Sequence, residues 1–161
     1  MPSDSSNPAS PLEISVACAS PTGIVGWRPV AGKGRGVIAL RACAARTEVE
    51  RAPVIVVPAA DLLEREDGRT VLDEYLLYWS DEPEKEVAMG GGLLMFYNHS
   101  DQPNVEFTDG PEPETMSVIA LRDIVAGEEL TYDYGVELWF TPAPPEPTSH
   151  RSPPRQRRRR A

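Results

Sequence analysis

The chain has 161 residues, 40% of them hydrophobic, which suits one globular domain with a modest core. Its 17 prolines and 12 glycines disfavour a helical bundle and predict many short elements joined by turns. The net charge of −9 is unevenly spread, because six arginines lie in residues 150–161, and without them 10 basic residues face 25 acidic residues, a net charge of −15. An acidic body is a poor surface for nucleic acid and attracts basic ligands or peptides, although solubility alone also explains it.

Short apolar runs between turn residues make up most of the chain. They predict strands over residues 14–19, 24–28, 37–40, 49–57, 72–79, 105–108, 116–121 and 128–132. Residues 58–66 are expected to form a short helix with Pro58 near its first turn, and residues 32–36 and 90–92 are expected to be glycine loops. Residues 12–140 therefore predict one mostly β domain with few short helices.

Both ends of the chain differ in composition from this domain. Residues 1–11 are rich in Ser, Pro and Asn and predict a disordered lead, while residues 141–161 are rich in Pro and Arg and predict a disordered tail. The arginine run 157–160 is a candidate nuclear-import or anion-binding patch, a solvated basic tail, or a segment that lies on the acidic body and imitates a substrate. Any nucleic acid is expected to bind through this tail alone.

The first motif is the glycine loop with Gly34 and Gly36, which matches part of a dinucleotide-binding fingerprint. That fingerprint requires a strand before the loop and a helix after it, whereas a predicted strand follows here, so a nucleotide-binding fold is not expected. Alone, the loop indicates either a hairpin turn or a close approach of the backbone to another group.

The second and third motifs lie later in the chain. The apolar run 93–97 stops abruptly at Asn98-His99-Ser100, which predicts polar side chains at the end of a buried strand. Such groups need partners in the protein or in a ligand, unless the tripeptide is an Asx-type turn. Tyr132 and Tyr134 lie two residues apart on a predicted strand and therefore face the same side, where cross-strand packing alone would also explain them.

In this order and spacing the motifs resemble those of the SET-domain lysine methyltransferases, closest to their minimal bacterial and viral forms. The family's signatures correspond here to Gly34-Arg35-Gly36, Asn98-His99-Ser100, and Gly127-Glu128-Glu129-Leu130-Thr131 with Tyr134, and Asp73-Glu74-Tyr75-Leu76 is similar to a further strand of the family. The resemblance spans residues 23–140. It implies a β-clip-like SET fold with several short twisted sheets, few short helices and a C-terminal segment threaded through a loop.

The resemblance also implies an enzyme, a protein-lysine N-methyltransferase that uses S-adenosylmethionine. In the family, the glycine loop and the Asn-His pair hold the cofactor, which assigns cofactor binding to Lys33, Gly34, Arg35, Gly36, Asn98 and His99, with Trp139 as a candidate to pack on the adenine. Tyr134 occupies the position of the catalytic tyrosine, and Tyr75 and Tyr132 those of the lysine channel. The position of Tyr132 is Tyr or Phe in the family, and a hydroxyl there crowds the amine, so mainly monomethylation is expected.

These residue types suit the chemistry that the family performs. An apolar, aromatic channel beside a positive sulfonium lowers the pKa of the substrate lysine from ~10.4, and tyrosine faces attract cationic and methylated amines. No metal is needed. The acidic body favours a basic protein substrate, with a histone, a histone-like protein, a ribosomal protein or the chain itself as candidates.

The chain departs from the common form of the family in its cysteines. That form has a Cys shortly after Asn-His and a zinc-binding segment at its C-terminus, whereas Ser100 and Asp101 follow His99 here and no Cys follows Cys43. No structural zinc is therefore predicted, and Cys18 and Cys43 are interpreted as small buried or half-buried thiols, with a disulfide as the alternative. Residues 136–140, or a second copy in a homodimer, are the candidates to close the lysine channel.

The sequence leaves two alternative functions open and also predicts where in the cell the protein lies. The same fold could serve as a non-catalytic module that binds basic peptides, but the presence of Tyr134 with Asn98 and His99 favours the enzyme. A nucleic-acid-associated protein would have to act through the arginine tail. No signal peptide and no apolar run of ~18 residues is visible, which predicts no membrane partner and an intracellular protein, in the cytoplasm or, through the tail, in the nucleus.

Overall fold

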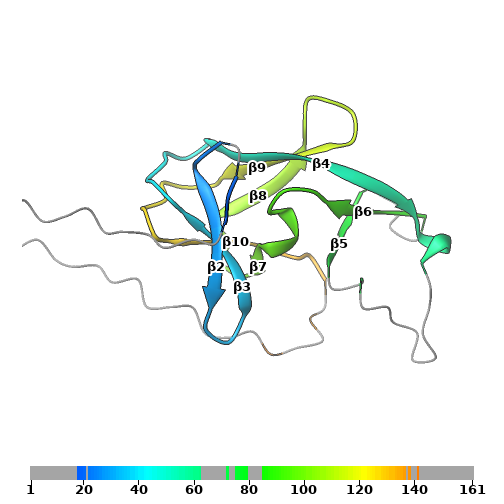
Figure 1. Cartoon of the computed structure of the whole chain (residues 1–161), viewed down its shortest axis with the longest axis horizontal. Helices are drawn as coiled ribbons and strands as arrows, with labels where there is room; N and C mark the ends of the chain where they lie inside the picture. Colours follow the sequence, from blue (N-terminus) through cyan, green and yellow to red (C-terminus); the bar gives the residue numbers. More distant parts are fainter. Residues whose placement is uncertain are drawn as a thin grey trace, which may run out of the picture.

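A computed structural model describes residues 18–20, 22–62, 72, 75–79, 85–136, 138 and 141. The predicted lead, most of the predicted tail and Trp139 lie outside the described residues, and the predictions about them stay predictions. Two five-stranded sheets form the body (Figure 1).

The first sheet brings the ends of the domain together. Its strands, in spatial order, are β1 (Cys18–Ala19), β2 (Val25–Val30), β3 (Gly34–Ala39), β10 (Glu129–Tyr132) and β7 (Asn98–His99). The β2 and β3 strands form an antiparallel hairpin, β10 pairs antiparallel with β3, and β10 pairs parallel with β7. The strand nearest the C-terminus therefore lies between a hairpin from the N-terminal part and a short strand from the middle of the chain.

The second sheet is antiparallel throughout and is built on one long strand. In spatial order it consists of β5 (Leu76–Tyr78), β6 (Glu86–Gly90), β4 (Glu48–Pro58), β9 (Thr115–Ala120) and β8 (Val105–Asp109). The first half of β4 pairs with β9, and its second half pairs with β6. In Figure 1 this second half extends to the right with β6 and β5.

Apolar side chains of both sheets pack into one core. Val25, Val37 and Leu130 come from the first sheet and Val49 and Val118 from the second, and each of them is 0% exposed. The continuous apolar run 54–57 is the pattern of a buried strand, but buried and exposed residues alternate along β4 and Ile55 is 66% exposed, so the strand is only half-buried. Burial of this shared apolar surface holds the two sheets against each other.

The structure confirms the mostly β fold and corrects several local predictions. Gly34 and Gly36 lie in β3 instead of a loop, so the glycine motif is a hairpin whose turn precedes Gly34. Residues 93–97 do not end a buried strand, because they contain the 3-10 helix η3 (Leu94–Phe96). The predicted helix at 58–66 is only η1 (Ala59–Asp61) among the described residues, and β6 was not predicted.

These 3-10 helices are three residues long. Within the described ranges, no helix has the length and apolar character that crossing a membrane requires. The threaded C-terminal segment stays a prediction, because residues 137, 139 and 140 lie outside the described part of the chain.

Candidate active site

Strand β10 carries the third motif into the first sheet, between the other two motifs. On one side it pairs with β3, the second strand of the glycine hairpin. On the other side, Thr131 is paired with Asn98, and Tyr132 with His99. Three segments far apart in the sequence therefore meet around β10.

Asn104 fastens the loop after β7 to the same strand. It is 3% exposed, its backbone N–H donates to the Thr131 carbonyl at 3.0 Å, and its side-chain oxygen accepts from the Thr131 N–H at 2.8 Å. Its amide nitrogen donates to the Glu129 carbonyl at 2.8 Å. These three hydrogen bonds join the loop to β10.

Gly36 allows the glycine hairpin to approach the other two motifs closely. A Cβ at this position would lie 2.6 Å from Val30 Cγ2 and 2.9 Å from both Asn98 Nδ2 and Glu129 Oε1, so a larger residue would force these side chains to shift. The Asn98 amide nitrogen donates to the Arg35 carbonyl at 2.9 Å and to Glu129 Oε1 at 2.8 Å. The first motif needs its second glycine for this reason.

Charged side chains of opposite sign lie beside this contact. Lys33 Nζ and Glu129 Oε2 are 2.7 Å apart, and their side chains are only 12% and 11% exposed. A Cβ on Gly34, whose φ is +78°, would meet no heavy atom of the described part within 4 Å. This set of groups is complementary to an α-amino acid: the Lys33 ammonium and the Asn98 amide suit its carboxylate, and the Glu129 carboxylate suits its ammonium.

Arg35 connects the hairpin to a neighbouring aromatic region. Its guanidinium lies 4.6 Å from the centre of the Phe96 ring, and its Nη2 donates to the Tyr75 hydroxyl at 3.4 Å. Tyr75 is thus held beside the glycine hairpin, at the boundary of the aromatic region.

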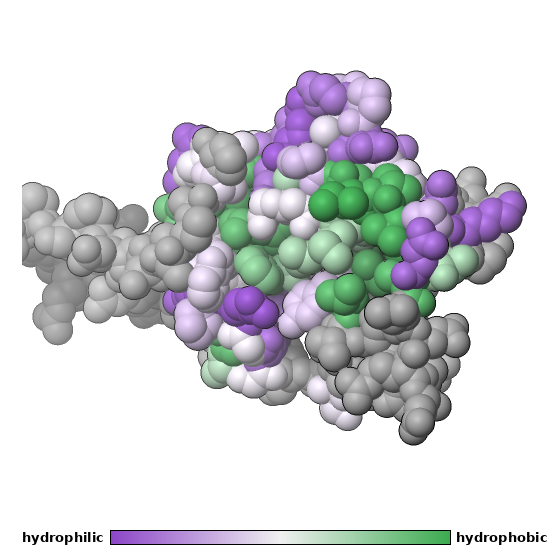
Figure 2. All heavy atoms as spheres, turned by 45° about the vertical axis from the view of Figure 1, so that its right-hand side comes forward, coloured by the Kyte–Doolittle hydropathy of each residue, from purple (hydrophilic) through white to green (hydrophobic). Residues whose placement is uncertain are grey.

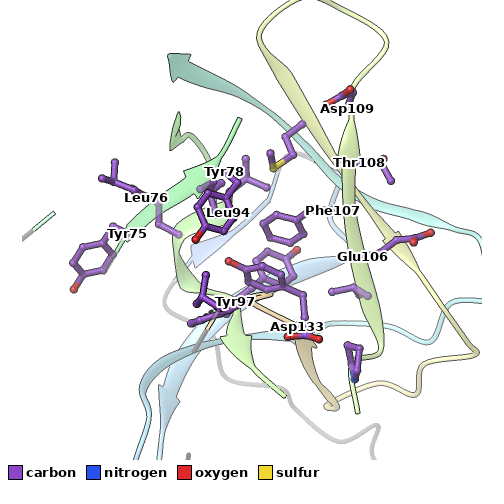
Figure 3. A pocket seen from close by; sticks show the side chains of 18 of the residues that line it. Tyr75, Leu76, Tyr78, Leu94, Tyr97, Glu106, Phe107, Thr108, Asp109 and Asp133 are labelled. Atoms are coloured by element: carbon purple, nitrogen blue, oxygen red, sulfur yellow. Dashed lines mark hydrogen bonds between the residues drawn. The ribbon is translucent and has the colours of Figure 1, made fainter. Parts of the chain in front are cut away.

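A cavity of about 480 Å³ lies next to β10. Its lining includes all three tyrosines predicted for the lysine channel, Tyr75, Tyr132 and Tyr134. Figure 3 shows that Phe107 lies near the centre of the lining side chains, whereas Tyr75 lies at one edge. The structure therefore brings Tyr132 and Tyr134 together and places Tyr75 at the rim.

The inner part of the cavity is a cluster of aromatic rings. The centres of the Tyr132 and Tyr134 rings are 4.8 Å apart. Phe107 stacks on Tyr132 at 4.2 Å with 9° between the planes, and Tyr97 meets Phe107 edge-on at 5.3 Å. Such contacts fix ring orientations as well as burying area.

Sequence reasoning did not assign Tyr97 and Phe107 to the site. Phe107 lies on a predicted strand, and Tyr97 lies directly before Asn98. The alternation of side chains along residues 105–108 is the signal that could have placed Phe107 on the same face as Val105, which also lines the cavity.

Tyr134 is held by two hydrogen bonds. Its hydroxyl donates to the Tyr97 carbonyl at 3.0 Å, and its backbone N–H donates to His99 Nδ1 at 3.2 Å. Since Nδ1 accepts, a neutral His99 ring carries its proton on Nε2, which lies 3.0 Å from Asp101 Oδ1. The His99 side chain, 5% exposed, is therefore a structural link to Tyr134.

Burial controls the ionisation of both tyrosines. Removal from water raises the pKa of Tyr134 and raises the pKa of Tyr132 even more, because the charged phenolate is disfavoured in an apolar surrounding. Both phenols stay protonated at neutral pH. They can donate or accept a hydrogen bond, but they are not bases.

Acidic side chains accompany the apolar lining. Glu106, Asp109 and Asp133 belong to the cavity wall together with residues such as Leu76 and Leu94. Figure 2 shows a broad apolar area bordered by hydrophilic residues on the face that brings the right-hand side of Figure 1 forward. A cavity of this composition suits a chain with an apolar stem and a basic end.

The segment predicted to close the channel is described only in part. Val136 lines the cavity, and Leu138 is described, while Trp139, the remaining candidate for cofactor contact, lies outside the described residues. Within the described ranges, no three His, Cys, Asp or Glu side chains are grouped so that they could hold a metal ion.

Known proteins share both the sequence and the shape of this region. The family model of the SET domain matches residues 34–135. A histone-lysine N-methyltransferase of Schizosaccharomyces pombe, specific for H3 lysine-37, is 38% identical over 108 residues, which cover 67% of this chain and 71% of the relative. A SET domain-containing protein of Phaeosphaeria nodorum is 30% identical over 114 residues, 70% of this chain and 18% of the relative.

A solved structure agrees with the fold. The crystal structure of a Plasmodium falciparum protein, titled as a histone methyltransferase, superposes with a TM-score of 0.55 at 22% identity and covers 72% of this chain and 96% of that one. At this level of identity the likeness concerns the fold alone.

Proposed function

Since this chain belongs to the SET-domain family, we propose that it is a protein-lysine N-methyltransferase that takes its methyl group from S-adenosylmethionine. The observation that carries the proposal is the aromatic cavity: Tyr132 at the end of β10 and Tyr134, two residues after that end, both line it, and the same strand is paired with Asn98 and His99. A lysine site and a cofactor site would thus share one strand.

The residues around Gly36 fit the cofactor's amino acid end. Lys33 and Glu129 supply opposite charges, Asn98 supplies an amide, and open backbone lies beside Gly34. In the proposed complex the backbone of residues 33–36 and the Asn98-His99 pair hold the cofactor. Bound S-adenosylmethionine supplies a methyl group on a positive sulfur, an electrophile that needs no metal activation.

The protein's own residues prepare the lysine. The amine must be neutral to accept a methyl group, and entry into the aromatic cavity lowers the pKa of the ammonium from ~10.4. Since burial raises the pKa of Tyr134, this residue does not take the proton, which leaves to water. The Tyr134 hydroxyl instead accepts a hydrogen bond from the amine and aligns it, while the walls exclude water.

Tyr132 limits the number of methyl groups in this proposal. Its ring is fixed by the stack with Phe107, and its side chain shares the cavity with Tyr134. A hydroxyl here occupies space that a methylated amine needs. The expected product is mainly monomethyl-lysine.

A basic protein segment is the proposed substrate. Glu106, Asp109 and Asp133 at the cavity would attract positive residues that flank the target lysine. The name of the Schizosaccharomyces pombe relative states an activity on histone H3, which makes histone H3 the first substrate to test.

The test is incubation of the protein with methyl-labelled S-adenosylmethionine and either histone H3 or a cell lysate, beside Tyr134→Phe. The wild type should label a basic protein, and Tyr134→Phe should bind the cofactor by calorimetry yet label about 10² times more slowly, the usual effect of removing one positioned hydrogen-bonding group. Equal labelling by both proteins would contradict the role of Tyr134. Peptide binding without labelling would favour the non-catalytic module.

A further inference from the structure

Glu50 is a charged residue in the hydrophobic core. It lies in β4 and is 0% exposed. A carboxylate taken out of water is costly unless hydrogen bonds compensate it, and burial accordingly raises the pKa of Glu50. No part of the proposed reaction uses this group directly.

The partners of Glu50 are the two residues that flank η3. One carboxylate oxygen accepts from the Leu93 N–H at 2.7 Å, and the other accepts from the Tyr97 hydroxyl at 2.8 Å. Leu93 is the residue before η3 and Tyr97 is the residue after it. Glu50 therefore holds both ends of this turn.

Gly92 makes room for the carboxylate. Its φ is +56°, and a Cβ at this position would lie 2.5 Å from Glu50 Oε1. A side chain here would displace either the turn or the carboxylate. The backbone around η3 is thus shaped around Glu50.

Tyr97 links this turn to both tyrosines of the cavity. Its carbonyl accepts the hydrogen bond from the Tyr134 hydroxyl at 3.0 Å. Its ring packs edge-on against Phe107, which stacks on Tyr132. A shift of Tyr97 would therefore move the carbonyl that binds the Tyr134 hydroxyl. It would also move Phe107, the ring on which Tyr132 stacks.

We propose that Glu50 is a positioning residue for methyl transfer: by holding η3 and Tyr97, it fixes the Tyr134 hydroxyl and, through Phe107, the ring of Tyr132. This inference rests on the proposed function. A purely structural role for Glu50 would lower stability and the amount of folded protein, but it would leave the rate per folded molecule and the product unchanged.

Three variants separate these roles. In Glu50→Gln, the amide oxygen can accept from Leu93 and the amide N–H can donate to the Tyr97 hydroxyl, so both ends of the turn stay held. Glu50→Leu loses both bonds, and Tyr97→Phe loses only the second. The measurements are kcat per cofactor-binding site, KM for histone H3, and the ratio of mono- to dimethyl-lysine by mass spectrometry.

Glu50→Leu and Tyr97→Phe should lower kcat at least about tenfold, because a displacement of ~1 Å costs up to about 10² in rate. Both should also shift the product toward dimethyl-lysine, because the channel loosens, while KM changes less than about threefold, as expected when an interaction matters mainly in the transition state. Glu50→Gln should stay within about threefold of the wild type, because its hydrogen bonds can be remade.

Two control variants separate other effects: one lowers only stability, and the other removes only a negative charge. Val25→Ala removes buried volume in β2 and should lower Tm without changing kcat per site. Glu48→Gln removes a carboxylate of the same strand that pairs with Arg51 on the surface and should leave both the product ratio and kcat unchanged.

The outcomes are distinct. An active wild type whose kcat per site and product ratio are unaltered by Tyr97→Phe and by Glu50→Leu overturns the role of Glu50 alone. If Glu50→Leu does not fold, Tyr97→Phe decides, because it retains the bond to Leu93. A wild type that binds the cofactor and transfers no methyl group overturns the proposed function, and the role of Glu50 with it.

Discussion

Tyr132 and Tyr134, which were predicted to lie on one strand, differ in their setting: Tyr132 is the last residue of β10, and Tyr134 lies beyond the end of that strand. The Tyr134 hydroxyl is bonded to the Tyr97 carbonyl, and its backbone is bonded to His99, so its oxygen has a fixed place. Tyr132 is held through its ring, which stacks on Phe107. In the proposed reaction, we therefore assign alignment of the amine to Tyr134 and control of the channel size to Tyr132.

Replacement of Tyr132 by Phe should change the product rather than abolish the reaction. The variant keeps the ring stack and loses only the hydroxyl that would crowd a methylated amine. Mass spectrometry of the product should show a shift from monomethyl- to di- and trimethyl-lysine. An unchanged distribution would remove Tyr132 from the control of methylation.

The close contact at Gly36 makes a second prediction at the scale of single atoms. Gly36→Ala would displace the side chains of Val30, Asn98 and Glu129, since its Cβ would lie 2.6 Å from the first and 2.9 Å from each of the other two, and overpacking of this kind costs about 1–3 kcal/mol. The affinity for S-adenosylmethionine, measured by calorimetry, should fall about tenfold or more, as 1.4 kcal/mol corresponds to tenfold.

Gly23→Ala is the matched control for that experiment. Its φ of +65° also disfavours a side chain, but a Cβ there would meet no described atom within 4 Å. It should lower stability and leave cofactor affinity unchanged. Equal affinity of the Gly36→Ala variant and the wild type would contradict a cofactor site at this contact.

At the scale of elements, local patterns predicted most strands, but they missed β6, extended β5 beyond Leu76–Tyr78 and did not predict η3. The runs at 105–108 and 116–121 are the hairpin of β8 and β9, and 128–132 contains β10, because alternation is a local property. The turn η3 was predicted as a strand, since its shape depends on a bond between Leu93 and the distant Glu50.

The candidate site also has a part that local sequence motifs predict and a part that only the fold brings together. Motif order led to the prediction of Gly36, Asn98 and Tyr134 as site residues, and the structure brings their segments together around β10. The ion pair of Lys33 with Glu129 and the stack of Phe107 on Tyr132 join residues from different strands. No local pattern contains such pairings, so sequence reasoning could not find them.

The bond between β4 and η3 makes a prediction about pH. Burial raises the pKa of Glu50 in the folded state above its unfolded value, so the native state binds more protons and its stability falls as pH rises through this range. Glu50→Gln has no such group. Urea unfolding from pH 4 to pH 8 should therefore show the free energy of unfolding of the wild type declining relative to Glu50→Gln.

The control for the pH series is Glu48→Gln. The pKa of Glu48 is lowered by its hydrogen bonds with Arg51 and Ser117, so any contribution of this group has the opposite sign: it is present above the unfolded pKa and is lost on acidification. A wild type that gains stability relative to Glu50→Gln as pH rises would contradict the assignment of a buried, raised-pKa carboxyl.

At the scale of the whole molecule, charge should govern how the substrate arrives. Without its last 12 residues the chain carries a net charge of −15, and acidic side chains line the cavity. Because salt shortens the range of such attraction to ~10 Å at 0.1 M and ~3 Å at 1 M, KM for histone H3 should rise with ionic strength while kcat changes little.

A double variant tests whether the cavity acids carry this effect. Glu106→Gln with Asp109→Asn should raise KM at low salt and flatten its salt dependence. Glu112→Gln, which removes a surface carboxylate paired with Arg51, is the control and should keep the wild-type salt response. If the double variant and Glu112→Gln show the same salt dependence of KM, the attraction comes from the net charge of the whole domain and not from the cavity acids.

The central claim is that this cavity moves a methyl group onto a lysine. Site-resolved mass spectrometry of histone H3 after incubation with S-adenosylmethionine tests it most directly, with wild type and Tyr134→Phe at equal concentrations of cofactor-binding sites. The wild type should add one methyl group to a lysine side chain, and Tyr134→Phe should form this product about 10² times more slowly. Modification of a residue other than lysine, or equal rates for the two proteins, would contradict it.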